Sequence, residues 1–212
     1  GCCLAAAYMN IPSAHIQAGD KSGHIDDISR MALAKLSHIH FASCGDSAER
    51  LRRLGEQEFR IFNVGAPQLD DMDQAESGAG SLTIGEDTIG LDHPYILLLQ
   101  HPVMVESEDA DTHMTASLKA CLGTGLGVIW IYPNADYGYR RILHVIDEWK
   151  DHGDVKVLSN VERSDYLTLL SNARVLVGNS SSGILEAPTY RTPVVNVGNR
   201  QRGRQQASNI ID

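Results

Sequence analysis

The densest group of side chains that could do chemistry lies between residues 177 and 204. An apolar run, 175–177, ends at Gly178, and three serines and Gly183 follow. Free backbone N–H groups at the start of a helix, with hydroxyls beside them, suit a phosphate. Glu186, about one turn further on, is placed to accept hydrogen bonds from a pair of hydroxyls, such as those of a ribose.

Three arginines follow a second apolar run, 194–197, in the same stretch: Arg200, Arg202 and Arg204. Guanidinium groups bind phosphate in a bidentate manner. A serine-rich turn beside a basic surface loop could be no more than solvated surface. The combination of hydroxyls, one carboxylate and three arginines instead favours a site for a phosphate and a ribose.

A second polar group occupies residues 15–27, which hold two histidines, three aspartates and a lysine. Paired acids near a histidine can divide general-acid and general-base work if their pKa values are pushed apart. We take Asp20 and Asp26 as candidates. The alternatives are a turn residue for Asp20 and a helix N-terminal charge for Asp26; we interpret Asp27 in the second way.

Two further loops carry polar side chains after apolar runs. His101 follows the run at residues 95–100, and Pro102 stiffens its backbone, so His101 could contact a phosphate or donate a proton. Asn134 and Asp136 could bind a base or a sugar. Asp136 could equally serve as a turn or N-cap residue.

The elements that must position these residues alternate along the chain. Strands are predicted at 13–18, 39–43, 60–64, 95–100, 128–131, 155–158, 175–177 and 194–197, and helices at 26–37, 47–54, 109–122, 137–150 and 165–171. This alternation predicts an α/β fold with right-handed crossovers and parallel sheets. Ligands of such sheets bind at the carboxyl ends of the strands, where the four polar loops fall.

A change in composition divides the chain. Residues 73–93 are rich in Asp, Glu, Gly and Ser and show no sustained period, so they are predicted to be a linker. Residues 94–212 would form a Rossmann-like domain. Residues 1–72 hold too few strands for a closed core, which predicts the C-terminal half of a Rossmann-like domain truncated at its N-terminus.

Bulk composition excludes several classes of function. The 212 residues carry a net charge of -9, which argues against nucleic-acid and membrane-surface partners. Four cysteines in no zinc or disulfide spacing indicate a cytoplasmic protein with reduced thiols. The histidines form no zinc motif, so no metal is predicted, and the absence of a P-loop and of a glycine-rich dinucleotide motif disfavours NTP hydrolysis and NAD chemistry. A nucleotide or nucleotide-sugar remains as the predicted ligand.

Four stretches, in order, resemble the UDP-N-acetylglucosamine 2-epimerase family: HIQAGDKSGHIDDISRMALAKLSHIHFAS, QHPV, YPNAD and GNSSSGILEAPTYRTPVVNVGNRQRGR. The resemblance implies a GT-B-like fold, with UDP held mainly by the second of two Rossmann-like domains. It implies that Ser180, Ser181 and Gly183 bind the diphosphate and that Glu186 binds the ribose. It also implies that Arg200 and His101 contact the phosphates and that Asn134 lies near the nucleotide.

The resemblance also implies the chemistry. A base removes the C2 proton of the sugar while UDP leaves from C1, and water then adds to the glucal, with no metal or redox cofactor. The GDKSG-HIDD form resembles the hydrolysing branch, which makes sialic-acid-type precursors. The implied catalytic residues are Asp20, Asp26, His101 and Gln17. Since the family commonly has a glutamate at Gln17, and glutamine cannot accept a proton, Asp20 or Asp26 would carry the base role.

Three alternatives remain open at this point. These are a non-hydrolysing epimerase that forms UDP-ManNAc, a GT-B glycosyltransferase, and a non-catalytic module that binds UDP-sugars. The expected partner is a UDP-sugar in each case, and the expected assembly is a homo-oligomer. A truncated first domain predicts that the 212-residue chain alone does not turn over.

Overall fold

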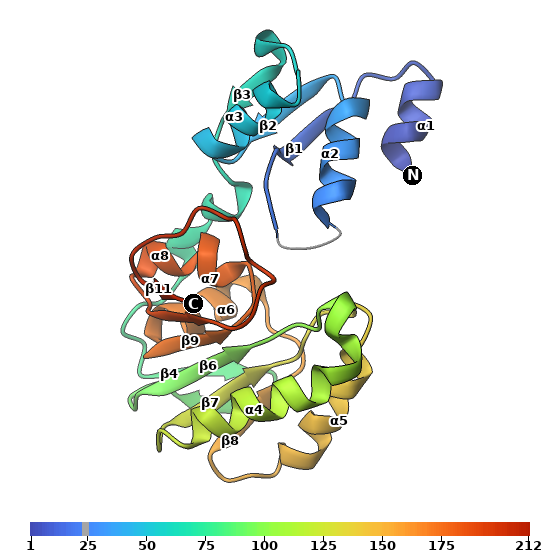
Figure 1. Ribbon diagram of the computed structural model, residues 1–212. Helices are drawn as coiled ribbons and strands as arrows, with labels where there is room; N and C mark the ends of the chain where they lie inside the picture. Colours follow the sequence, from blue (N-terminus) through green and yellow to red (C-terminus); the bar gives the residue numbers. More distant parts are fainter. Residues whose placement is uncertain (23–25) are drawn as a thin grey trace. The chain divides into compact units, whose positions relative to one another are not determined.

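The computed structural model describes residues 1–22 and 26–212 and divides into two compact units (Figure 1). Unit 1 contains Gly1–Asp70 and Asn199–Gln205, and unit 2 contains Asp71–Gly198 and Gln206–Asp212. In the described residues, no helix is long and apolar enough to cross a membrane.

Unit 1 is built on a parallel sheet in the order β1-β2-β3. Its strands are β1 (Ala14–Ala18), β2 (Ile39–Ala42) and β3 (Ile61–Asn63), and its helices are α1 (Cys2–Tyr8), α2 (Asp26–Leu36), α3 (Gly45–Arg53), η1 (Glu58–Arg60) and η2 (Pro67–Leu69). The core is small, and four of its six buried side chains are alanines packed around Leu51 and Ile61. Short side chains let α2 and α3 approach the sheet closely.

Unit 2 is built on a larger parallel sheet in the order β11-β10-β9-β6-β7-β8. Its strands are β6 (Tyr95–Leu99), β7 (Gly127–Ile131), β8 (Val155–Leu158), β9 (Val175–Gly178), β10 (Val194–Asn196) and β11 (Ile210–Ile211). Its helices are η3 (Met72–Gln74), η4 (Met104–Asp109), α4 (Ala110–Leu122), α5 (Tyr139–Trp149), α6 (Arg163–Asn172), α7 (Ser182–Leu185) and α8 (Ala187–Tyr190).

The central strand β6 is buried on both faces, which explains its unbroken apolar sequence. Ile96 and Leu98 face one side, where α4 and α5 cover the sheet, and Leu97 and Leu99 face the other, where α6 and α8 pack. Burial of each such side chain contributes roughly 1.5–3 kcal/mol. The loops that follow these strands are therefore anchored in a closely packed core.

Residues 73–93, predicted as a linker, contain an antiparallel hairpin of β4 (Ser81–Ile84) and β5 (Asp87–Gly90). Ile89 is buried and Leu82 and Ile84 are partly buried against the core face that also holds Leu97. Gly85 has a φ of +62° at the tip of the hairpin, a conformation that glycine adopts without strain.

The α/β alternation and the parallel sheets predicted from the sequence are confirmed. One predicted element differs in form. The segment after Gly178 makes two four-residue helices, α7 and α8, with Glu186 between them. Pro188 explains the break, because its ring lacks an N–H and clashes with the carbonyl of the residue four before it.

Candidate functional site

The sheet of unit 2 has a topological switch point between β6 and β9. The chain proceeds from β6 through β7 to β8 on one side and continues with β9, β10 and β11 on the other. Leu99, the last residue of β6, pairs with Gly178, the last residue of β9. A ligand of a doubly wound sheet binds outside the carboxyl ends of the strands at such a point, so the loops after Leu99 and Gly178 are the expected binding loops.

Gly178 permits the two loops to start this close together. Its φ is +137°, and a Cβ built on it would lie 2.0 Å from the carbonyl oxygen of Leu99. A side chain is therefore excluded both by the backbone conformation and by the neighbouring strand.

Asn179 connects the two loops by a pair of hydrogen bonds. Its Oδ1 accepts from the backbone N–H of His101 at 2.7 Å, and its Nδ2 donates to the His101 carbonyl at 2.8 Å. The backbone N–H of Asn134 donates to Nδ1 of His101 at 3.0 Å. Because Nδ1 accepts a hydrogen bond, the neutral His101 ring carries its proton on Nε2 and can donate it.

Asn134 is held by its own loop. Its Nδ2 donates to Asp136 Oδ2 at 2.6 Å, and no side-chain cap is made at the start of α5, so Asp136 orients Asn134 instead of capping the helix. The Oδ1 atom of Asn134 is buried and accepts no hydrogen bond from the described residues. A buried acceptor without a donor is suited to an N–H group of a ligand.

The serines of the next loop stand at the start of α7. Ser180 and Ser182 are buried, and the N–H of Ser182 donates to Ser180 Oγ at 3.3 Å. Since α7 has only four residues, its dipole is small, and hydroxyls and turn N–H groups contribute more to anion attraction. A Cβ on Gly183 would lie 2.9 Å from Val194 Cγ1, so Gly183 also serves the packing of α7 on β10.

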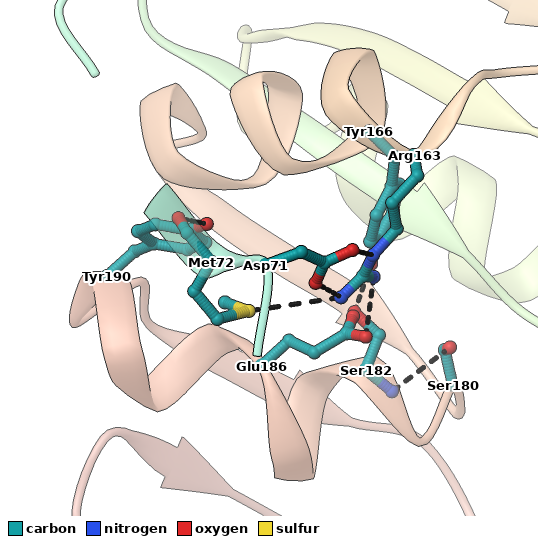
Figure 2. A network of polar contacts seen from close by, with 8 residues as sticks. All are labelled: Asp71, Met72, Arg163, Tyr166, Ser180, Ser182, Glu186 and Tyr190. Carbon is teal, nitrogen blue, oxygen red and sulfur yellow. Dashed lines mark hydrogen bonds and ion pairs between the residues drawn. The ribbon is translucent and has the colours of Figure 1, made fainter. Parts of the chain in front are cut away.

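Glu186 belongs to a network of polar contacts shown in Figure 2. Nη1 of Arg163 donates to Glu186 Oε1 at 2.7 Å, while Nε and Nη2 donate to the two oxygens of Asp71 at 3.2 and 3.0 Å. The hydrogen bond with Asp71 raises the pKa of Arg163, and the same bond lowers the pKa of Asp71. The ion pair between Arg163 and Asp71 is therefore charged at neutral pH.

Tyr166 contributes a neutral phenol beside this network. Its hydroxyl makes a short hydrogen bond with Ser182 Oγ. Burial, and next the charge of Glu186, raise the pKa of Tyr166, so the phenol keeps its proton at neutral pH.

Unit 1 holds the other predicted residues, beginning with Asp20 and Gln17. Asp20 is buried at the end of β1, and its Oδ1 accepts hydrogen bonds from the hydroxyls of Ser43 and, at 2.8 Å, Ser47. Gln17 has a φ of +57°, and the register of β1 on β2 shifts at this residue. A bulge of this kind redirects side chains and is frequent beside active sites.

The loop after Asp20 lies partly outside the described residues, since 23–25 are not described. Asp26 is exposed in the first turn of α2, where Asp27 also lies. Asp27 Oδ1 accepts hydrogen bonds from the N–H and the hydroxyl of Ser22. Burial is the main cause that lowers the pKa of nearby His15. The charges of His40 and Arg30 lower this pKa further, and the charge of Asp20 raises it.

The arginine loop 199–205 groups with unit 1. Arg204 is half-buried, and its burial is the main cause that lowers its pKa. The charges of Arg30 and Arg200 lower this pKa further, whereas the charge of Asp20 raises it. An arginine stays protonated under such shifts. Arg30 and Arg200 therefore lie close enough to Arg204 to repel its charge, and the carboxylates of Asp20 and Asp27 partly offset this repulsion.

The predicted residues fall into two groups. Unit 2 brings together His101, Asn134, Ser180, Ser181, Gly183 and Glu186, and unit 1 contains Gln17, Asp20, Asp26 and Arg200. That one diphosphate contacts both Arg200 and the serines stays a prediction. In the part of the chain that the structure describes, no three His, Cys, Asp or Glu side chains are grouped to hold a metal ion.

Sequence reasoning missed several residues of the site. Asn179 precedes the three serines. Its position directly after the end of a predicted strand was the sequence signal that could have identified it. Arg163 and Asp71 carried no signal, because they are separated by 92 residues. Arg30 lies in the middle of α2, where one basic residue is unremarkable.

The doubly wound parallel sheet and the polar loops at its switch point define a nucleotide-binding type of α/β protein. Residues 1–211 match the model of a protein family described as UDP-N-acetylglucosamine 2-epimerase. The chain is a member of this family.

Comparison with individual proteins gives the same family. The chain is 39% identical over 209 residues to the UDP-N,N'-diacetylbacillosamine 2-epimerase (hydrolyzing) of Legionella pneumophila, covering 99% of this chain and 55% of that protein. It is 35% identical to the UDP-N-acetylglucosamine 2-epimerase of Neisseria meningitidis, covering 93% and 52%. The chain thus spans about half the length of these curated relatives.

A solved structure supports the fold. The UDP-GlcNAc 2-epimerase of Methanocaldococcus jannaschii, in complex with UDP-GlcNAc and UDP, superposes with a TM-score of 0.75 at 20% identity, covering 94% of this chain and 57% of that one. The GT-B-like fold class predicted from the sequence is confirmed by this likeness.

Proposed function

We propose that the whole protein is a hydrolysing 2-epimerase that converts a UDP-2-acetamido sugar and water into UDP and the free 2-epimeric sugar. The observation that carries the proposal is the arrangement at the switch point of unit 2. His101 and Asn134 follow the ends of the neighbouring strands β6 and β7. His101 has its proton on Nε2, and Asn134 has a buried acceptor that accepts no hydrogen bond from the described residues. The buried carboxylate of Glu186 follows α7, beyond the end of β9. Family membership and the name of the Legionella relative support the same reaction.

Unit 2 binds the UDP part in this proposal. Ser180, Ser181 and the turn at Gly183 contact the diphosphate, Glu186 accepts hydrogen bonds from the ribose hydroxyls, and Asn134 contacts the nucleotide. His101 donates Nε2–H to a phosphate oxygen. This hydrogen bond strengthens as negative charge develops on the departing diphosphate, which lowers the barrier to breaking the C1–O bond.

The reaction has two steps. In the first, a base takes the proton from C2, the C–H electron pair forms the C1–C2 double bond, and the C1–O bond breaks to release UDP. In the second, water adds its oxygen to C1, and C2 receives a proton on the opposite face. The sum is one water consumed and one UDP released for each sugar epimerised.

Unit 1 provides the proton-transfer groups in this proposal. Asp20 and Asp26 are the base and acid candidates, and Gln17 contacts the sugar without accepting a proton. Asp20 is held by two hydroxyls on one oxygen, Oδ1, and a carboxylate has about four lone-pair sites, so acceptor capacity remains. Arg200 stabilises the departing phosphates.

The substrate is a UDP-N-acetylhexosamine or its 2,4-diacetamido analogue. The second form is supported by the diacetylbacillosamine named for the Legionella relative. A role in supplying sialic-acid-type precursors, a cytoplasmic location and a homo-oligomeric state stay predictions.

Product analysis tests this function. The full-length protein is incubated separately with UDP-N-acetylglucosamine and UDP-N,N'-diacetylbacillosamine, and the products are identified by chromatography and mass spectrometry. Equal amounts of UDP and a free 2-epimeric sugar are expected from one of them. Formation of UDP-ManNAc without free sugar would replace the hydrolysing reaction by the non-hydrolysing one, and UDP release only with a sugar acceptor would indicate a glycosyltransferase.

A further inference from the structure

The guanidinium of Arg163 lies between two carboxylates that come from distant parts of unit 2. One edge, Nε and Nη2, makes a bidentate contact with Asp71, and Nη1 contacts Glu186 (Figure 2). Arg163 opens α6, Asp71 precedes η3, and Glu186 lies between α7 and α8. Three elements therefore meet at one planar cation.

Because Glu186 is buried, its ion pair with Arg163 matters for the orientation of its carboxylate. The Glu186 side chain exposes only 7% of its surface, whereas Arg163 and Asp71 expose about a third. A buried carboxylate requires a charged partner, and the direction of that partner determines where its remaining lone pairs point. Because Arg163 takes Oε1, the acceptor sites left on Glu186 have a defined direction.

Asp71 fixes the guanidinium in turn. A free arginine can offer either edge of its fork to a carboxylate. Nε and Nη2 are bound to Asp71, and Nη1 is directed at Glu186. Asp71 therefore fixes the orientation of the guanidinium that contacts Glu186.

We infer that Arg163 and Asp71 are positioning residues that aim Glu186 at the ribose hydroxyls and so make the site select ribonucleotides over deoxyribonucleotides. The inference rests on the proposed function, in which Glu186 binds the ribose. Selection against a missing hydroxyl follows because a buried carboxylate aimed at that hydroxyl would lose its donor.

The test compares UDP with 2′-deoxy-UDP by isothermal titration calorimetry on the full-length protein. The native protein is expected to bind UDP about tenfold more tightly, which corresponds to about 1.4 kcal/mol. Arg163→Lys keeps the charge but not the fork, and Asp71→Asn releases the guanidinium. In both variants UDP binding should weaken about tenfold and 2′-deoxy-UDP binding less than about threefold, so the preference for UDP should fall from about tenfold to about threefold or less.

Arg141→Lys is the matched control, because Arg141 makes an ion pair with Asp111 on the surface of the same unit. It should leave the ratio of the two dissociation constants unchanged. Thermal melting of each variant separates positioning from general stability.

Each other outcome has a defined meaning. If the native protein binds neither nucleotide, the proposed function fails and this inference fails with it. If the native protein binds both equally well, Glu186 does not select ribose and only the inference fails. If both variants keep the native ratio while their melting temperatures fall, Arg163 and Asp71 have a structural role only, which also overturns the inference.

Discussion

Replacing Gly178 by alanine should disrupt unit 2 more than any other glycine-to-alanine change in its sheet. The added Cβ would lie 2.0 Å from the Leu99 carbonyl oxygen and 2.5 Å from its carbonyl carbon. Neither atom can move away easily, because β6 is paired with β7 and β9 on its two sides. The left-handed backbone adds a cost of its own.

The magnitude is the sum of these two effects. A side chain at positive φ costs roughly 1–2 kcal/mol. Overpacking a core typically costs about 1–3 kcal/mol, and contact with backbone instead of a flexible side chain places this case at the upper end. The free energy of unfolding should therefore fall by about 3 kcal/mol or more.

Two other glycines separate the effects. Gly125 has a φ of +76° but open space around its Cβ position, and Gly127 has open space and no positive φ. Gly125→Ala should therefore lose about 1–2 kcal/mol. Gly127→Ala should be neutral or gain up to about 1 kcal/mol.

Urea unfolding followed by tryptophan fluorescence measures this series. The chain has two tryptophans, Trp130 and Trp149, and both lie in unit 2, so the signal reports that unit. If Gly178→Ala unfolds at the same urea concentration as Gly125→Ala, the inference that β9 and β6 approach too closely for a side chain at Gly178 is wrong.

Three further predictions concern other parts of the site. Asn179→Ala removes both hydrogen bonds to the His101 backbone, and we expect a loss of about 1–3 kcal/mol in stability together with weaker UDP binding; calorimetry showing native affinity would contradict it. Tyr166→Phe removes the hydrogen bond to Ser182 and should cost about 0.5–1.5 kcal/mol in urea unfolding, and an unchanged midpoint would show that this bond contributes nothing. Burial lowers the pKa of His40, so the unfolded chain binds more protons, and unit 1 should lose stability as pH falls below about 6.5. Circular dichroism melts at pH 5.5 and 7.5 check this, with His40→Gln expected to reduce the difference; a native protein equally stable at both values would refute it.

The parallel sheet of unit 2 was predictable because its central strands are apolar on both faces. Residues 95–99 form an unbroken run, and the strand end at Gly178 is marked by the serines that follow. The loops at these ends were predictable for the same reason, since ligands of parallel sheets bind there.

The hairpin in residues 73–93 was missed although a signal exists. Leu82 and Ile84 alternate with polar residues, and Gly85-Glu86 separates them from Ile89 in the way that two-residue hairpin turns require. The surrounding polar composition hid this short pattern, since only one face of the hairpin is apolar.

The Arg163 network could not be predicted from one sequence. Its members are spaced by 92 and 23 residues, and neither spacing corresponds to a helix or strand period. The break between α7 and α8 was signalled by Pro188, but the direction of the Glu186 side chain depends on α6, whose position is set by core packing.

The most direct test of the central claim is proton NMR of the full-length protein with its UDP-sugar in D₂O. We expect UDP to appear together with a free sugar of the opposite configuration at C2, and that sugar should carry deuterium at C2. Release of UDP with the C2 proton and configuration retained would contradict the proposed mechanism.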